Sequence, residues 1–190
     1  MLSTDHSSFA TADLDEIQTL PALFRWRVEK TPHQEAYRQF DDGTERWIGC
    51  SWHEIALKVE ACRRALDAEQ LNPGDRIAIL MPNGIEHVAM DQAALSRGLV
   101  PVPLHAVDNP ESIIYILQDS GASLLFLASS ERWETLAAAG NRLDGLKRVI
   151  CAKGAAGFKS SDSRIVTLDQ WLQKRTGARR GPKRGRHPTR

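Results

Sequence analysis

Residues 74–104, GDRIAILMPNGIEHVAMDQAALSRGLVPVPL, decide the fold class, because a strand pattern, a helix pattern and a second strand pattern follow one another in this stretch. The apolar runs at 76–82 and 99–104 are too short for most helices, and such runs are typical of strands buried on both faces of a parallel sheet. The residues between them predict a helix over 85–97, which stops where Gly98 follows. The stretch therefore predicts a strand, a crossover helix and a second, parallel strand.

The same alternation continues toward residue 172 and predicts an α/β fold with a parallel sheet covered by helices. Asn109 offers a helix cap, Pro110 suits the first helical turn, and Gly121 marks the end of that helix. The expected elements here are a helix over 110–119, a strand over 123–128, a helix from about 131, and strands over 147–151 and 164–168.

Three further elements are expected before this sheet. A short amphipathic helix is expected over about 20–31, because its apolar residues recur at helical spacing. The runs EAYRQF and TERWIGC flank the DDG tripeptide at 41–43 and predict a β-hairpin. Ser51 and Glu54 form an S-x-x-E capping box, which predicts a helix over about 52–69.

Composition and charge divide the chain into three regions. The 190 residues are 42% hydrophobic, which excludes a wholly disordered or collagen-like chain and fits one globular domain. Residues 174–190 hold eight of the 25 Lys and Arg residues and no acid, so the part before them has 17 basic against 24 acidic residues. We expect a loose acidic lead-in over 1–18, a folded domain over 19–173 and a disordered basic tail over 174–190.

The sequence also bears on cellular location and redox state. No apolar run approaches the roughly 18 residues that a membrane-spanning helix needs, and the first twenty residues contain acids and no Lys or Arg, unlike a signal peptide. A cytoplasmic protein is expected, with peripheral attachment at a membrane left open. The cysteines Cys50, Cys62 and Cys151 form no C-x-x-C pair and are interpreted as reduced core thiols.

A ligand site in a doubly wound sheet lies at the carboxyl ends of the strands, which here means the turns after Leu80, Leu104 and Leu127. None of these turns carries a phosphate-binding signature, because neither G-x-G-x-x-G nor G-x-x-x-x-G-K-[ST] occurs in the sequence. A dinucleotide-binding or P-loop protein is therefore disfavoured.

Histidine and aspartate residues have simple structural interpretations in this sequence. The histidines His53, His87 and His105 have no second histidine at metal-ligand spacing and are interpreted as surface or helix-face residues. The paired carboxylates Asp41 and Asp42 adjoin a glycine, which favours a turn over general acid–base catalysis.

Serine and tryptophan residues are interpreted in the same way. Ser129 and Ser130 lack a surrounding G-x-S-x-G and are expected to cap the helix that contains Glu131. The five tryptophans are dispersed, which favours packing over a platform for stacking nucleic-acid bases.

Several strings resemble the opening portion of acyl-adenylate-forming, AMP-binding enzymes, and most of all long-chain fatty-acid CoA ligases. The most specific piece is G-D-R-I-A-I-L-x-x-N-x-x-E at 74–86, followed by G-L-V-P-V-P-L at 98–104 and E-x-I-x-Y-I-L-x-D-S at 111–120. LPALFRWRVEKTPHQEAY, SWHEIALKVEACRRAL and IVTLDQWL add to the resemblance, which covers about 20–172.

The resemblance implies a ligase that works in two steps. A fatty-acid carboxylate attacks the α-phosphate of Mg-ATP to give an acyl-adenylate and pyrophosphate, and the thiol of CoA then displaces AMP. The fold implied for 19–173 is part of the family's large N-terminal domain, and the substrates and cofactors implied are a fatty acid, ATP, Mg²⁺ and CoA.

The family's catalytic motifs are absent from this sequence: the S-G-T-T-G-x-P-K-G phosphate loop, the Y-G-x-T-E and T-G-D segments, and the lysine of the small C-terminal domain. No catalytic, cofactor-binding or metal-binding residue is therefore assigned. The matching part is expected to be scaffold, and the chain is expected to be inactive alone.

The segment TGARRGPK at 176–183 follows the T-G-x-x-x-G-P-K order of the phosphate loop, but Ala178 and two arginines stand where small hydroxylated residues belong. It is interpreted as coincidence. The abrupt change near 174 suggests a frameshift or early stop in a longer gene. A shortened α/β domain leaves strand edges and apolar faces without partners, which predicts poor solubility.

Two alternatives from other classes stay open. One is a non-catalytic module, either a regulatory partner of a full-length homologue or an adaptor whose basic tail neutralises nucleic-acid phosphates. For the tail, a solvated basic run without a partner is favoured, and no specific nucleic acid is expected. The other is a different small α/β enzyme with no residue to name.

Overall fold

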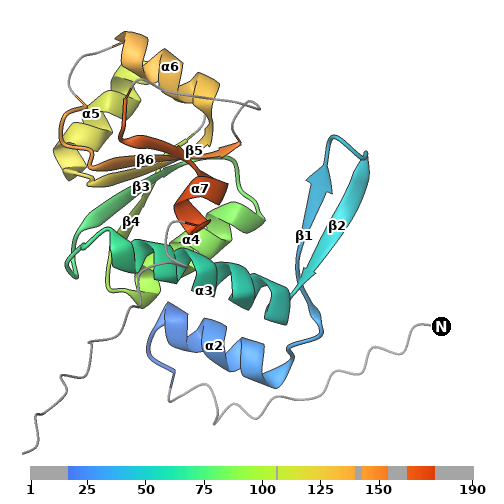
Figure 1. Cartoon of the computed structure of the whole chain (residues 1–190). Coiled ribbons are helices and arrows are strands. Elements are labelled where there is room, and N and C mark those ends of the chain that lie inside the picture. Colours follow the sequence, from blue (N-terminus) through green and yellow to red (C-terminus); the bar gives the residue numbers. More distant parts are fainter. Residues whose placement is uncertain (1–16, 106, 140–142, 154–161, 174–190) are drawn as a thin grey trace, which may run out of the picture.

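The computed structural model describes residues 17–105, 107–139, 143–153 and 162–173. Within them the chain forms a five-stranded sheet and a separate two-stranded hairpin, with helices around both (Figure 1). The elements in chain order are α2 (Leu20–Lys30), β1 (Glu35–Asp41), β2 (Arg46–Ser51), α3 (Trp52–Ala68), β3 (Arg76–Leu80), α4 (Ile85–Ser96), β4 (Val100–Pro103), α5 (Pro110–Ser120), β5 (Leu124–Ser129), α6 (Ser130–Ala139), β6 (Arg148–Lys153), β7 (Ile165–Thr167) and α7 (Leu168–Gln173).

The five-stranded sheet has the order β4-β3-β5-β6-β7, and every neighbouring pair is parallel. In the register of the central pair, Ile77 lies opposite Leu124 and Leu80 opposite Leu127. The α/β fold with a parallel sheet, predicted from the sequence, is confirmed.

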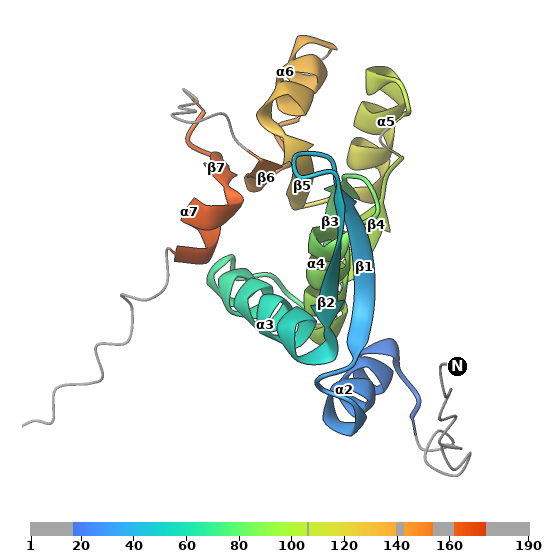
Figure 2. The ribbon, with the colours of Figure 1, turned by 90° about the vertical axis from the view of Figure 1, so that its right-hand side faces the viewer.

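Helices cover both faces of this sheet, and two separate apolar cores result (Figures 1 and 2). Ile77 and Ile79 of β3 belong to the core under α3, α4 and α7, whereas Ala78 and Leu80 belong to the core under α5 and α6. Neighbouring side chains of a strand point to opposite faces, so a strand that is apolar throughout buries residues in both cores. This explains the continuous apolar runs at 76–82 and 123–128. The run at 99–104 was also expected to be buried on both faces, but β4 lies at the edge of the sheet and Val100 is exposed.

The predicted hairpin is present, and β1 pairs with β2 in antiparallel fashion. Asp41 lies opposite Arg46, so residues 42–45 form the connecting loop rather than a two-residue Asp-Gly turn. The carboxylate of Asp41 accepts hydrogen bonds from the backbone N–H (2.8 Å) and the hydroxyl (3.2 Å) of Thr44. Glu45 takes the left-handed conformation, with a φ of 51°.

The helix signals read from the sequence are confirmed at two helix starts. The hydroxyl of Ser51 accepts from the backbone N–H of Glu54 (3.2 Å), and the Glu54 carboxylate accepts from that of Ser51 (2.8 Å), so the capping box of α3 is complete. The Asn109 side chain accepts from the N–H of Ser112 at the start of α5 (2.8 Å).

The C-terminal helix α7 was not expected from the sequence. It begins with a reciprocal cap in which the Thr167 side chain accepts from the Gln170 N–H (3.2 Å) and the Gln170 side chain accepts from the Thr167 N–H (3.0 Å). The T-x-x-Q spacing is a variant of the capping box and was available as a signal. Trp171 anchors the helix, because its side chain is buried against the core under α3 and α4.

Several expectations fall on residues outside the described ranges. They concern the lead-in up to residue 16, the TGARRGPK segment and the basic tail over 174–190. The division into three regions stays a prediction. Of the helices that are described, none combines the length and the apolar character needed to cross a lipid bilayer.

Candidate functional site

The helix α4, which follows the carboxyl end of β3, is bonded at its start to the hairpin. The amide oxygen of Gln39, in β1, accepts a hydrogen bond from the backbone N–H of Ile85 (2.9 Å). No side chain near Gly84 caps this helix, so a residue 46 positions away in the sequence does so. A Cβ atom on Gly84 would lie 2.7 Å from the Gln39 oxygen, so a larger residue here would displace the end of the Gln39 side chain.

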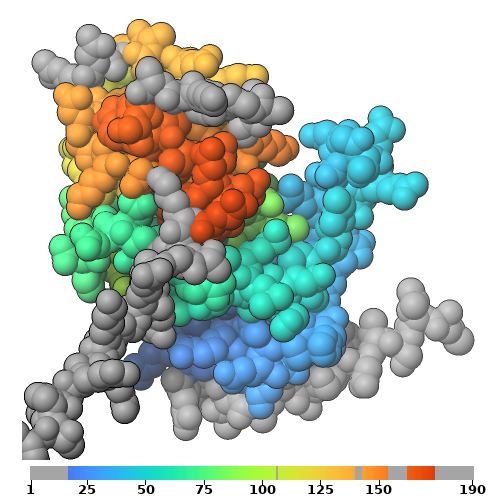
Figure 3. Space-filling view, viewed as in Figure 1, coloured from blue at the N-terminus to red at the C-terminus, as the bar shows by residue number. Residues whose placement is uncertain are grey.

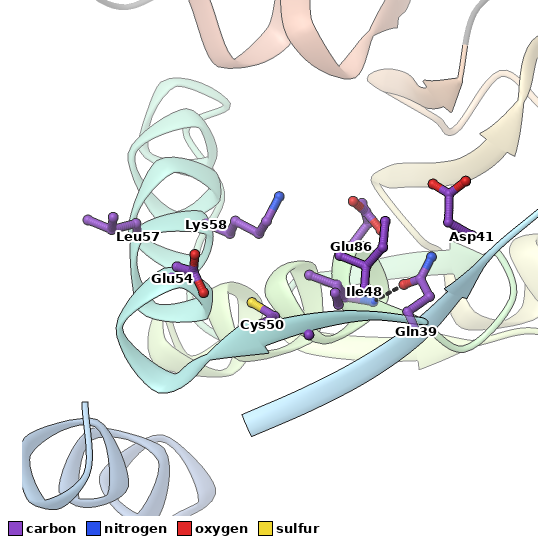
Figure 4. A pocket seen from close by; sticks show the side chains of 10 residues that line it. Gln39, Asp41, Ile48, Cys50, Glu54, Leu57, Lys58 and Glu86 are labelled. Atoms are coloured by element: carbon purple, nitrogen blue, oxygen red, sulfur yellow. Dashed lines mark hydrogen bonds between the residues drawn. The ribbon is translucent and has the colours of Figure 1, made fainter. Parts of the chain in front are cut away.

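One cavity, of about 480 Å³, lies between the hairpin and helices α3 and α4, and we call it the hairpin cleft. In Figure 4, Lys58 reaches from α3 toward the side where Ile48 and Glu86 lie, and the dashed line marks the bond from Gln39 to the start of α4. The cleft is lined by Gln39, Asp41, Ile48, Gly49, Cys50, Glu54, Leu57, Lys58, Ile85 and Glu86.

A second cavity, of about 800 Å³, shares Gln39, Asp41 and Ile85 with the hairpin cleft. Residues 82–84, directly after β3, line it together with both hairpin strands and Lys153 at the end of β6. Of the three turns singled out by sequence, only the one after Leu80 contributes to its lining. The predicted edge of the sheet therefore does carry a concave surface, although the hairpin supplies much of it.

The start of α4 and the hairpin cleft do not fit a nucleoside triphosphate. A helix N-terminus can bind a phosphate through its free N–H groups, but at α4 Gln39 already accepts from Ile85, and Glu86 stands in the first turn. The hairpin cleft has three carboxylates and a single lysine in its lining. Its net charge repels an anion, so no phosphate-binding role is assigned to it.

Two of the three carboxylates of the hairpin cleft, Asp41 and Glu54, have structural roles. Hydrogen bonds from Thr44 lower the pKa of Asp41, and hydrogen bonds from Ser51 lower the pKa of Glu54. A lowered pKa favours the ionised form at neutral pH, which suits an acceptor and not a general acid. The interpretation of Asp41 as a turn residue is therefore supported by its hydrogen bonds.

The histidines do not converge on one site in the described part of the chain. His53 and His105 are exposed, and His87 is half-buried on α4. Sequence reasoning left out His33, whose ring lies 6.4 Å from that of His53 between centroids. In the part of the chain that the structure describes, no three His, Cys, Asp or Glu residues lie close enough to hold a metal ion.

The three cysteines are buried and free, as expected. Burial raises the pKa of the Cys62 thiol to about 12 and that of the Cys151 thiol to about 11. A thiol reacts as its thiolate, so neither is suited to act as a nucleophile at neutral pH.

A half-buried carboxylate, Asp91, lies on α4. Burial raises the pKa of Asp91, and His87 opposes this effect. Burial also raises the pKa of the nearby Tyr37 hydroxyl, and Asp91 adds to that shift. The ionised form of Asp91 is therefore less favourable in the folded chain than in water.

We expect Asp91→Asn to raise the free energy of unfolding at neutral pH. Because the pKa of Asp91 is raised on folding, the folded chain binds the proton more tightly, and stability falls as the pH rises from the unfolded value of about 3.9 through the folded value. The increase in the free energy of unfolding caused by the substitution should be largest at neutral pH and should vanish in acid. Urea unfolding across this pH range measures it.

The matched control for that measurement is Asp42→Asn, in the exposed loop of the hairpin. A gain at Asp91 that stays constant across the pH range would contradict the burial argument.

Comparison with known proteins identifies the family. The model of the "AMP-binding enzyme" family matches residues 24–183, which is most of the chain. The chain belongs to the AMP-binding enzyme family. The matched range extends beyond the last described residue, Gln173, and includes the TGARRGPK segment.

Curated relatives in this family include two mycobacterial ligases. The long-chain-fatty-acid–CoA ligase FadD15 of Mycobacterium bovis is 27% identical over 124 residues, which cover 65% of this chain and 20% of the relative. The long-chain-fatty-acid–AMP ligase FadD26 of Mycobacterium tuberculosis is 29% identical over 123 residues, covering 60% of this chain and 20% of the relative. The chain thus spans about a fifth of their length.

A solved structure shows the same fold. The crystal structure of the anthranilate CoA ligase AuaEII, in complex with anthranoyl-AMP, superimposes with a TM-score of 0.68 at 14% identity. The match covers 86% of this chain and 29% of AuaEII. The fold described above is therefore part of the fold of an acyl-adenylate-forming ligase.

Proposed function

We propose that this chain is the scaffold portion of a ligase that activates long-chain fatty acids, and that it is inactive alone. The observation that carries the proposal is the family match over residues 24–183. The names of FadD15 and FadD26 support the substrate class, because both are ligases of long-chain fatty acids.

The proposed reaction has two steps. The fatty-acid carboxylate displaces pyrophosphate from the α-phosphorus of ATP and forms an acyl-adenylate. The thiol of CoA then attacks the acyl carbon, so that a thioester forms and AMP leaves. Charge develops on the pyrophosphate in the first step, and its stabilisation requires cationic groups or a metal ion around the phosphates.

The start of α4 and the hairpin cleft do not supply this environment. The start of α4 is already capped by Gln39, and the hairpin cleft is lined mainly by carboxylates. No step of the reaction is therefore assigned to a residue described here. Their contribution is to hold the sheet, its helices and the hairpin in fixed positions.

We expect the purified chain to catalyse no exchange of pyrophosphate into ATP, with or without palmitate. The physical reason is that the phosphate loop and the other catalytic motifs, which stabilise the charge on the phosphates in the family, are absent from the sequence. The assay follows labelled pyrophosphate, with intact FadD15 as the active control. Exchange that depends on both the chain and palmitate would contradict the proposed inactivity.

The proposed scaffold role is tested by joining this chain to the rest of a relative. In a chimeric ligase, this chain replaces the matching segment of FadD26. We expect the chimeric ligase to show palmitate-dependent exchange, whereas FadD26 lacking that segment should show none. A folded chimeric ligase without exchange would count against the proposed role of this chain as a working scaffold.

A further inference from the structure

Two exposed histidines lie close together where the chain enters and leaves the hairpin. His33 lies between α2 and β1, and His53 is the second residue of α3. The centroids of their rings are 6.4 Å apart, and the ring planes are inclined at 49°. The helices α2 and α3 lie side by side at the surface of the molecule (Figure 3). The two histidines thus bring together segments that the whole hairpin separates in sequence.

Backbone hydrogen bonds fix this arrangement. The N–H of His53 donates to the carbonyl of Pro32 (2.8 Å), and the N–H of Trp52 donates to the carbonyl of Gln34 (3.1 Å). His33 stands between these two carbonyls in the chain, so the start of α3 holds it from both sides. The folded backbone therefore sets the distance between the two side chains, and such preorganisation lowers the entropic cost of binding a ligand.

Both imidazoles are available to a ligand. Within the described residues, neither imidazole takes part in a hydrogen bond or an ion pair. The carboxylate of Glu54 interacts electrostatically with His53. This carboxylate accepts hydrogen bonds from the N–H (2.8 Å) and the hydroxyl (2.7 Å) of Ser51, so it adds negative charge beside the histidines while it caps α3. Such a charge favours a cation over an anion.

The spacing of the two rings suits a shared metal ion. Zn²⁺ binds histidine nitrogen at about 2.0 to 2.1 Å with tetrahedral angles, which places the centroids of two bound rings about 5 Å apart. The observed separation of 6.4 Å is slightly larger. Because both side chains are exposed, rotation about their side-chain torsions can bring the rings together. Imidazole is a common ligand of zinc, nickel and copper ions, whereas Mg²⁺ and Ca²⁺ prefer oxygen ligands.

We propose that His33 and His53 form a binding site for Zn²⁺, or for a similar divalent ion that prefers imidazole, in which water supplies the other ligands. Two protein ligands are fewer than the four of a closed structural zinc site, so the chain folds without the ion and exchanges it with solvent. The bound ion links the segment that enters the hairpin to the start of α3. The site uses neither ATP nor a fatty acid, and this inference does not depend on the proposed function.

Calorimetric titration of the full chain with Zn²⁺ tests the site. We expect one Zn²⁺ to bind per chain, and His33→Ala and His53→Ala should each weaken the affinity at least about tenfold. The double variant should lose little more than either single variant, because both substitutions remove the same site. The matched control is His105→Ala, at another exposed histidine, which should leave the affinity unchanged. An excess of Mg²⁺ should not compete.

Thermal unfolding gives a second readout of the same site. An ion that binds only the folded chain raises the unfolding temperature. We expect this rise with Zn²⁺ in the chain and in His105→Ala, and no rise in His33→Ala or His53→Ala. Without Zn²⁺ the three variants should unfold at nearly the same temperature as the unaltered chain, because exposed side chains contribute little to stability.

Two results would overturn the proposal. One is an affinity for Zn²⁺ that stays unchanged in His33→Ala or in His53→Ala. The other is a loss in His105→Ala as large as the loss in His33→Ala, which would mean that surface histidines bind the ion without forming a defined site. Neither result depends on pyrophosphate exchange, so the metal site and the proposed ligase function can fail separately.

Discussion

Replacing Glu69 by glutamine is expected to lower the free energy of unfolding by about 2 to 4 kcal/mol. This is slightly less than the energetic cost of removing one partner from a fully buried ion pair. Glu69 follows α3, and its side chain is only 10% exposed. Its carboxylate accepts from the guanidinium of Arg148 in β6 (3.1 Å) and from the indole N–H of Trp171 in α7 (2.9 Å). Glutamine keeps an acceptor but cannot balance the charge of the partly buried Arg148.

Urea unfolding of the full chain measures this loss. The matched control is Glu60→Gln on the same helix, where Glu60 pairs with Arg63 at 2.7 Å but both side chains are more than a third exposed. Exposed pairs contribute at most about 1 kcal/mol. Equal losses at Glu60 and Glu69 would mean that burial does not set the strength of the interaction at Glu69.

Replacing Trp171 by alanine is expected to lower the free energy of unfolding by about 3 to 5 kcal/mol, the usual cost of deleting a large aromatic side chain from a core. Trp171 is 2% exposed and joins α7 to the core under α3 and α4. Its removal also leaves Glu69 with one hydrogen-bond donor fewer. The loss should appear in urea unfolding followed by circular dichroism.

The variant Trp171→Phe separates the two contributions, because it keeps an aromatic ring and removes the indole N–H. It should cost clearly less than alanine. The effects of Trp171→Phe and Glu69→Gln should not add, because the two side chains share a hydrogen bond. A loss below about 1 kcal/mol for Trp171→Ala would contradict the docking of α7 on the core.

Family resemblance and fold class were both predictable from the sequence, for different reasons. The family was predictable because the G-D-R-I-A-I-L string and its neighbours are specific. The fold class was predictable because strands buried on both faces must be apolar at every position, as Ile77, Ala78, Ile79 and Leu80 are. The helix α7 was missed, although Thr167 and Gln170 carry a capping signal.

The candidate site was predictable only in part. The turn after Leu80 was expected at a ligand-binding edge and does line a cavity. The polar residue Gln39 gave no sign that it would cap a helix 46 residues later. No pattern in the sequence indicated that Ile48 and Leu57 would line one cleft.

The sequence by itself determined most elements of this protein: where α3 and α5 start, where the hairpin turns, and that β3 and β5 are buried on both faces. These signals are local, because a helix start must satisfy its free N–H groups with side chains a few residues away. Only the tertiary structure decided the strand order β4-β3-β5-β6-β7, the bond from Gln39 to α4 and the contacts of Glu69. These features join residues far apart in sequence. Packing of the apolar faces decides which strands and helices become neighbours. The polar groups that this packing brings together must then find hydrogen-bond partners.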